Sequence, residues 1–90
     1  MKARKKPVLV DAWQLPSVDK NEFIDNLPDD IYKRVTYFSI NGSLYYLIDS
    51  IEGVMRANAG DYLIYGGHDD VWVIRQYIFG KTYEIVEVGE

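Results

Sequence analysis

One stretch of the chain, His68-Asp69-Asp70, places an imidazole beside carboxylates. Such residues can bind a metal ion, or an aspartate can orient the histidine as a general base. Three neighbouring residues in a turn rarely converge on one ion, however, and the sequence has no second histidine and no cysteine. A catalytic or metal site needs groups that converge in space. We therefore expect a solvated polar loop here, and we predict no catalytic residue, no metal and no cofactor.

Serine hydroxyls are the other candidate nucleophiles, at Ser17, Ser39, Ser43 and Ser50. None of them lies in a nucleophile elbow or in an S-x-x-K sequence. With one histidine and no cysteine, the chain has little to activate a nucleophile. The sequence therefore predicts a protein that is not an enzyme.

The second candidate site combines Gly66 and Gly67 with Trp72 and Arg75. No Lys-(Ser/Thr) follows the glycines, so they do not form a P-loop, and their ordinary role is a turn with positive φ. Alternatively, they let an anionic or aromatic ligand approach the backbone, with Trp72 stacking on it and Arg75 supplying charge. Residues three apart in a regular strand point to opposite faces. Trp72 and Arg75 therefore reach one ligand only through a bulge or across a subunit boundary.

Charge is divided unevenly along the 90 residues, which carry a net charge of −4. Residues 2–6 hold four of the ten positive charges, and from Pro7 onward 14 acidic residues outweigh 6 basic ones. We expect residues 1–6 to be a flexible basic arm on an acidic domain. Because the acidic body repels nucleic acid, we do not expect a nucleic-acid partner.

The absence of cysteine excludes disulfides and fits a reducing cytoplasm. No apolar run approaches the roughly 18–20 residues of a membrane span. The basic start is followed by Pro7 and an alternating segment instead of an apolar signal sequence. We therefore expect a cytoplasmic protein without a membrane partner.

Alternating apolar residues and turn residues predict one domain over residues 1–90, of the α+β class and mostly antiparallel. We expect about six to seven short strands in a small barrel-like or curled sheet, at residues 7–15, 35–40, 43–48, 54–57, 62–65, 71–74 and 82–88. One short helix is predicted near residues 19–27, with Asp19 as its N-cap and Glu22 at the third position, and Pro28 can start one further helical turn. At the end of the first strand, Trp13 is expected to pack at an edge, and the Gln14 amide to bond a neighbouring backbone group.

The strongest local signal is Asn41-Gly42, the preferred pair for a two-residue type I′ hairpin. This turn pairs Ile40 with Ser43 and gives a hairpin that is apolar on both faces. One face carries Thr36, Phe38, Ile40, Tyr45 and Leu47, and the other carries Val35, Tyr37, Leu44, Tyr46 and Ile48. One short helix cannot cover both faces, so we expect a closed sheet, self-association, or both. Our candidate self-association residues are Tyr37, Leu44, Tyr46 and Ile48.

The chain begins with M-K-A-R-K-K-P-V, and its C-terminal half contains G-D-Y-L-I-Y-G followed by I-F-G-K-T-Y-E. In these segments it resembles a family of small bacteriophage and prophage proteins, whose members share that start and end in G-D-(Y/W)-(I/L)-I-x-G and I-F-x-x-T-Y-E. Where many members have K-P-D, this chain has Arg75-Gln76-Tyr77. The resemblance implies a phage origin and an architecture, but no chemistry.

These observations predict a non-enzymatic phage or prophage accessory protein that acts by binding in the bacterial host cytoplasm, as a homo-oligomer. It would neutralise a host factor, either a host defence protein or a small nucleotide-like signal. The alternative is a structural, assembly or regulatory phage component with no small-molecule ligand.

Overall fold

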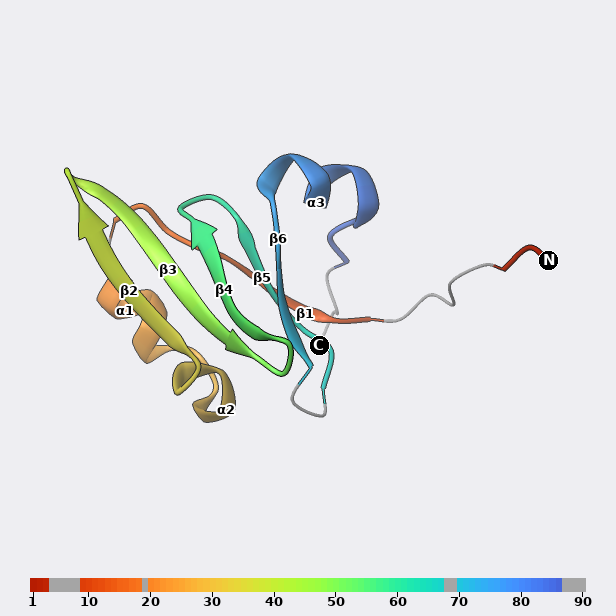
Figure 1. Cartoon of the computed structure of the whole chain (residues 1–90), viewed down its shortest axis with the longest axis horizontal. Coiled ribbons are helices and arrows are strands. Elements are labelled where there is room, and N and C mark those ends of the chain that lie inside the picture. The colour runs from red at the N-terminus through yellow and green to blue at the C-terminus, as the bar shows by residue number, and fades with distance from the viewer. Residues whose placement is uncertain (4–8, 19, 68–69, 87–90) are drawn as a thin grey trace.

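The structure is a computed structural model and describes residues 1–3, 9–18, 20–67 and 70–86. Figure 1 shows these residues as six antiparallel strands with three short helices. The elements are β1 (Asp11–Gln14), α1 (Lys20–Asp25), α2 (Asp29–Tyr32), β2 (Val35–Ile40), β3 (Ser43–Ser50), β4 (Gly53–Asn58), β5 (Tyr62–Tyr65), β6 (Val71–Ile74) and α3 (Gln76–Thr82). One sheet has the order β1-β5-β6 and the other the order β2-β3-β4. The prediction of a small, mostly antiparallel α+β fold is confirmed, with two three-stranded sheets in place of a closed barrel.

The hairpin of β2 and β3 forms as its turn residues predict. Asn41 and Gly42 both have positive φ, 51° and 82°, as the two central positions of a type I′ turn require. Ile40 pairs with Ser43, and Tyr37 pairs with Tyr46. With this register, the side chains of β2 and β3 fall into the two sets that were predicted for the two faces of the hairpin.

The hairpin of β5 and β6 also has the predicted bounds. Gly66 N–H donates to the carbonyl of Asp70 at 2.9 Å, and Gly67 has a φ of 89°. Gly67 therefore has the turn role expected of a glycine with positive φ. His68 and Asp69 lie outside the described residues.

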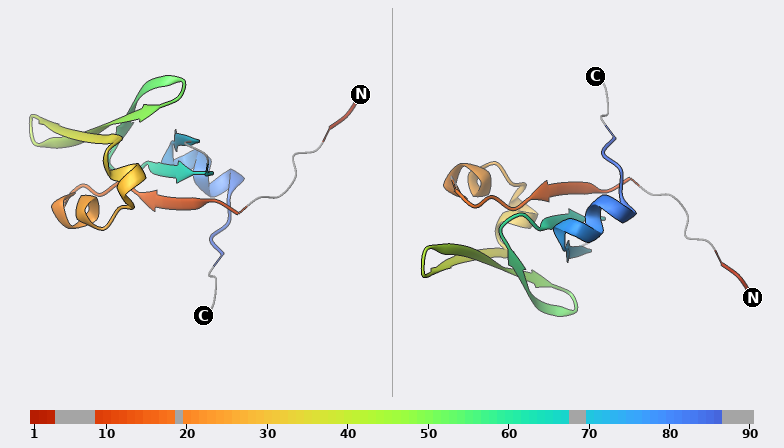
Figure 2. Two further views of the ribbon diagram at one scale, coloured as in Figure 1. Left: turned by 90° about the horizontal axis from the view of Figure 1, so that it is seen from below. Right: turned by 90° about the horizontal axis from the view of Figure 1, so that it is seen from above.

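The two sheets enclose the core, and the short helices α1 and α2 close it (Figure 2). On the inner face of the β2-β3-β4 sheet, Tyr46, Ile48 and Ala57 are fully buried. The core consists of Leu15, Ile24, Leu27, Ile31, Tyr46, Ile48, Ala57, Leu63 and Val71. The apolar stripe of the predicted helix thus faces the core, while its proposed N-cap, Asp19, lies outside the described residues. Among the residues that the structure describes, no helix covers the opposite, outer face of this sheet (Figure 2).

The C-terminal strand predicted at residues 82–88 is wrong. Thr82 ends α3, and residues 83–86 form no strand, while residues 87–90 lie outside the described part. A contact distant in sequence favours the helix, because the Phe79 ring stacks on Tyr62 with centroids 3.7 Å apart. Phe79 also stacks locally on Tyr83, at the end of the same helix, at 5.2 Å. Tertiary packing here outweighs the β propensity of the aromatic residues. The first strand is also shorter than predicted and begins at Asp11.

Tyr46 is the largest fully buried side chain of the core, and its hydroxyl donates a hydrogen bond to the carbonyl of Pro16. Burial raises the pKa of Tyr46 from 10.0 to about 12. Below pH 10 the phenol is neutral in both states, so its full contribution to stability is present. Between pH 10 and about 12 only the unfolded chain ionises, and the contribution is lost as pH rises.

We expect Tyr46→Phe to lower the free energy of unfolding by about 1–2 kcal/mol at pH 7, since the Pro16 carbonyl loses its donor. The difference between wild type and variant should shrink from pH 10 to 12, by at most about 1.4 kcal/mol per pH unit. Urea denaturation across this range measures both effects. Tyr32→Phe, at a half-exposed side chain, is the control. A difference that stays constant from pH 9 to 12 would contradict this account of Tyr46.

Candidate functional site

The structure does not bring together the four residues predicted to bind a ligand. Gly66 and Gly67 form the turn at one end of the β5–β6 hairpin, whereas Arg75 follows β6 at the other end, beyond the Tyr62–Ile74 pair. A four-residue strand separates these ends by about 13 Å. Within a single chain, Arg75 therefore does not lie beside the two glycines.

Arg75 instead forms an ion pair with Asp61, with 2.8 Å between Arg75 Nη1 and Asp61 Oδ2. The Asp61 side chain is only 8% exposed, so it needs donors to compensate for lost water. It receives two more hydrogen bonds, from the backbone N–H of Asn58 to Oδ2 and from that of Gln76 to Oδ1. Since Gln76 begins α3, the Asp61 carboxylate caps that helix from another part of the chain. The role of Arg75 is thus structural.

Gly60 and Gln14 complete the same corner. The Gln14 amide donates to the Gly60 carbonyl at 3.1 Å, which confirms the predicted bond from this side chain to a neighbouring backbone. Gly60 has a φ of 96°, and a Cβ there would lie 2.8 Å from Gln76 Oε1. Leu15 N–H donates to the Asp61 carbonyl at 2.8 Å. The residues after β4, Gly60 and Asp61, therefore meet Gln14 and Leu15 of the first strand region in one structural corner.

Trp72 packs against the backbone of Gly66. A Cβ on Gly66 would lie 3.1 Å from the Cη2 and Cζ3 atoms of the Trp72 ring. An aromatic ring laid across a glycine in this way covers backbone that would otherwise face water, a known device in antiparallel sheets. The glycine next to Trp72 is thus explained by cross-strand packing.

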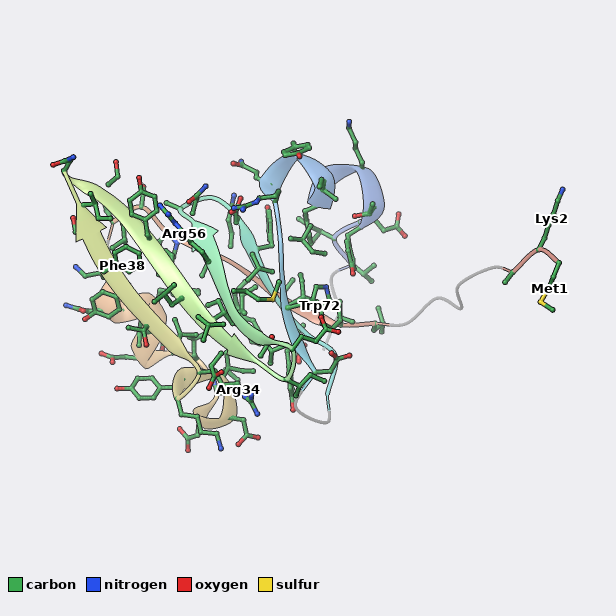
Figure 3. All side chains as sticks on the ribbon, viewed as in Figure 1. Met1, Lys2, Arg34, Phe38, Arg56 and Trp72 are labelled. Atoms are coloured by element: carbon green, nitrogen blue, oxygen red, sulfur yellow. The ribbon has the colours of Figure 1, made fainter. Side chains whose placement is uncertain are left out.

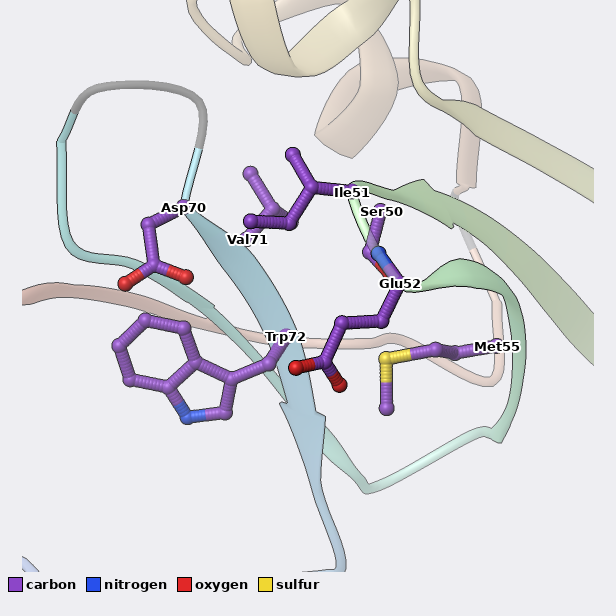
Figure 4. A pocket seen from close by; sticks show the side chains of 7 residues that line it. All are labelled: Ser50, Ile51, Glu52, Met55, Asp70, Val71 and Trp72. Atoms are coloured by element: carbon purple, nitrogen blue, oxygen red, sulfur yellow. The ribbon is translucent and has the colours of Figure 1, made fainter.

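A hollow of about 320 Å³ lies on another side of the Trp72 ring, and its lining residues are Ser50, Ile51, Glu52, Met55, Asp70, Val71 and Trp72. Figure 4 shows the carboxylates of Glu52 and Asp70 on two sides of the indole. No lining residue is basic. Two carboxylates beside an aromatic face favour a cation and disfavour a phosphate. The hollow therefore argues against the nucleotide-like ligand predicted for this region.

The four residues predicted for self-association lie on the inner face of the β2-β3-β4 sheet. Tyr46 and Ile48 are 0% exposed, and Leu44 packs against the same core. For Leu44, Tyr46 and Ile48 the prediction is corrected, because α1, α2 and the β1-β5-β6 sheet of the same chain cover them. Tyr37 is different: it is 39% exposed at the edge of the sheet, beside Lys20 and Asn21 of α1.

The outer face of the β2-β3-β4 sheet carries the exposed aromatic and apolar side chains. Phe38 stacks on Tyr45 with centroids 5.6 Å apart, and the Arg56 guanidinium lies 4.5 Å from the centre of the Tyr45 ring. Ile40 and Val54 on the same face are 48% and 66% exposed. Phe38 and Arg56 lie on the two edge strands of this sheet, β2 and β4 (Figure 3). We call these residues, with Leu47, the outer face. Sequence alternation located this set of β2 and β3 side chains, but gave no sign of which face stays open.

Within the described residues, no group of three or more His, Cys, Asp or Glu side chains is placed to hold a metal ion. No helix in this part of the chain is long and apolar enough to cross a membrane. Comparison of the chain with family models, with curated proteins and with solved structures finds no match.

We expect Asp61→Asn to lower the free energy of unfolding by about 2–4 kcal/mol, because an amide cannot accept all three hydrogen bonds and leaves Arg75 without its charge partner. Urea denaturation measures the loss. Asp30→Asn is the matched control, since Asp30 pairs with Lys33 at 3.9 Å on the surface and should cost less than about 1 kcal/mol. Equal losses in the two variants would show that the Asp61 corner does not hold the fold together.

Proposed function

We propose that this chain is a non-enzymatic phage or prophage accessory protein that binds a host protein through the outer face. The outer face carries this proposal: an aromatic pair, an arginine stacked on one of its rings, and aliphatic neighbours that no other described helix or strand covers. Tyr and Arg are the residue types enriched at the centres of protein interfaces. The phage origin rests on the resemblance of the two chain ends.

A protein partner fits this face better than a small molecule does. The outer face is an open sheet surface, whereas small ligands are bound in concave sites that bury most of their surface. Its one basic side chain, Arg56, is already stacked on Tyr45, and the chain as a whole is acidic. A partner that is apolar at its centre, with an acceptor for the Arg56 guanidinium, matches this chemistry.

We also propose that the chain acts as a homo-oligomer in the cytoplasm of the bacterial host. The support is the partly exposed Tyr37 at an open sheet edge, next to the outer face. The alternative function, a structural or assembly component of the phage, would use the same outer face against phage proteins. The identity of the protein that contacts this face separates the two functions.

Site-specific photo-crosslinking in bacterial cells tests the proposal. With p-benzoylphenylalanine in place of Phe38, we expect a crosslink to one host protein. The same crosslinker in place of Tyr77, an exposed residue of α3, should give none. With the captured protein purified, Arg56→Ala should weaken binding at least about tenfold, and Lys81→Ala on α3 should not.

Three other results of these experiments would favour a different function or contradict the proposal. A crosslink from position 38 only to phage proteins would favour the assembly function. No crosslink at this position, or equal binding by Arg56→Ala and Lys81→Ala, would contradict the proposed role of the outer face. A small molecule released from the purified protein by heat and identified by mass spectrometry would favour sequestration of a signal.

A further inference from the structure

Strand β2 is an open edge of the β2-β3-β4 sheet, and its sequence V-T-Y-F-S-I contains no charge, no proline and no glycine. Natural proteins usually protect such edges with charged residues, proline or a bulge, because an unpaired strand is a template for another chain. The other edges follow that rule. β1 contains Asp11, β4 contains Arg56, and β6 lies between Asp70 and Arg75.

The hydrogen-bonding groups that β2 presents outward can be assigned from its turn. Ile40 and Ser43 flank the two-residue turn and bond each other, so alternate residues of β2 face β3. The N–H of Asp49 donates to the carbonyl of Arg34 at 2.8 Å, which fits this series. The backbone groups of Val35, Tyr37 and Ser39 therefore point away from β3.

These outward groups have no partner in the described part of the chain. The backbone hydrogen bonds outside the ladders include none to Val35, Tyr37 or Ser39, and β2 makes its main contacts with β3 alone. Tyr37 reaches α1 only through its ring and hydroxyl, with Lys20 Nζ 5.3 Å from the ring centre. The outward backbone of β2 is thus free to pair with another strand.

We propose that two copies of this chain pair through β2, antiparallel about a two-fold axis that passes through Tyr37. An axis perpendicular to the sheet keeps both outer faces on the same side. With Tyr37 on the axis, Val35 pairs with the partner's Ser39, and the three outward residues of each strand form about six backbone hydrogen bonds. An axis through Phe38 would pair Tyr37 with the partner's Ser39 and give about four within the strand.

A second copy fits this edge because of charge. Each chain carries a net charge of −4, so two copies repel wherever their acidic surfaces meet. β2 is an uncharged segment, and the antiparallel arrangement keeps the basic residues before it, Lys33 and Arg34, at opposite ends of the joined strands. Pairing also joins the two outer faces into one six-stranded surface. The inference rests on the proposed self-association and specifies its geometry.

The mass of the protein in solution tests the pairing. Light scattering at micromolar concentration should give twice 10.4 kDa for the wild type. Ser39→Pro removes an outward N–H but no bond to β3, so it should give a monomer with an unchanged circular-dichroism spectrum. Val54→Lys changes an exposed site on β4, away from the β2 edge, and should stay dimeric.

A wild-type monomer would overturn both the self-association and this pairing. A Ser39→Pro dimer would overturn the β2 edge while leaving self-association in place. Crosslinking to a host protein from position 38 is independent of both outcomes.

Because the chain has no cysteine, single-cysteine variants test the register of the paired strands. Tyr37→Cys should give the dominant disulfide dimer in a glutathione buffer, since hydrogen-bonded residues on a two-fold axis have Cα atoms about 5.5 Å apart. In this register the two copies of Ser39 are about 13 Å apart along the strands, and the copies of Phe38 about 7 Å, so Ser39→Cys and Phe38→Cys should crosslink poorly. A maximum at position 38, or equal yields at all three positions, would overturn the proposed axis.

Discussion

The carboxylate of Asp61 is the interaction on which the arrangement of this small protein depends. It accepts hydrogen bonds from the end of β4, the first residue of α3 and the Arg75 side chain, and its own backbone carbonyl accepts from Leu15 after β1. A buried carboxylate is costly unless such donors surround it, so the elements that supply them are fixed relative to each other. This corner joins the β1-β5-β6 sheet and α3 to the end of β4, and so holds the β1-β5-β6 sheet against the inner face of β2-β3-β4. Within the described part of the chain, no helix or second sheet covers the outer face of β2-β3-β4.

The local hairpins could be predicted from the sequence because their turns are encoded locally. Asn41 and Gly42 fix one register through their positive φ values, and the apolar runs Tyr62–Tyr65 and Val71–Ile74 on either side of the glycine turn locate the other hairpin. Helix α3 could not be predicted in this way. Its cap comes from Asp61, 15 residues earlier, and its buried Phe79 stacks on Tyr62. A single sequence does not reveal which distant residues will meet.

The outer face was predicted only in part, because contacts between distant residues also decide which face of the hairpin is covered. Alternation in β2 and β3 identified two apolar faces, but either of them could have been the open one. Which face is closed is decided by the packing of α1, α2 and the β1-β5-β6 sheet, which bury Tyr46 and Ile48. Sequence spacing also gave no sign that the Arg75 guanidinium would pair with Asp61 at the far end of the hairpin from the glycines. With the inner face closed, the outer face and the β2 edge are the surfaces on which our proposals for partner binding and self-association rest.

The central claim is that this chain closes one face of its sheet internally and uses the uncharged β2 edge to pair with a second copy. Residue-resolved amide hydrogen exchange tests it directly. We predict that the outward amides of Val35, Tyr37 and Ser39 are as protected as those of Thr36, Phe38 and Ile40 at high protein concentration. Dilution should expose the outward set selectively. Fast exchange at Val35, Tyr37 and Ser39 at every concentration, with the alternate residues protected, would contradict the claim.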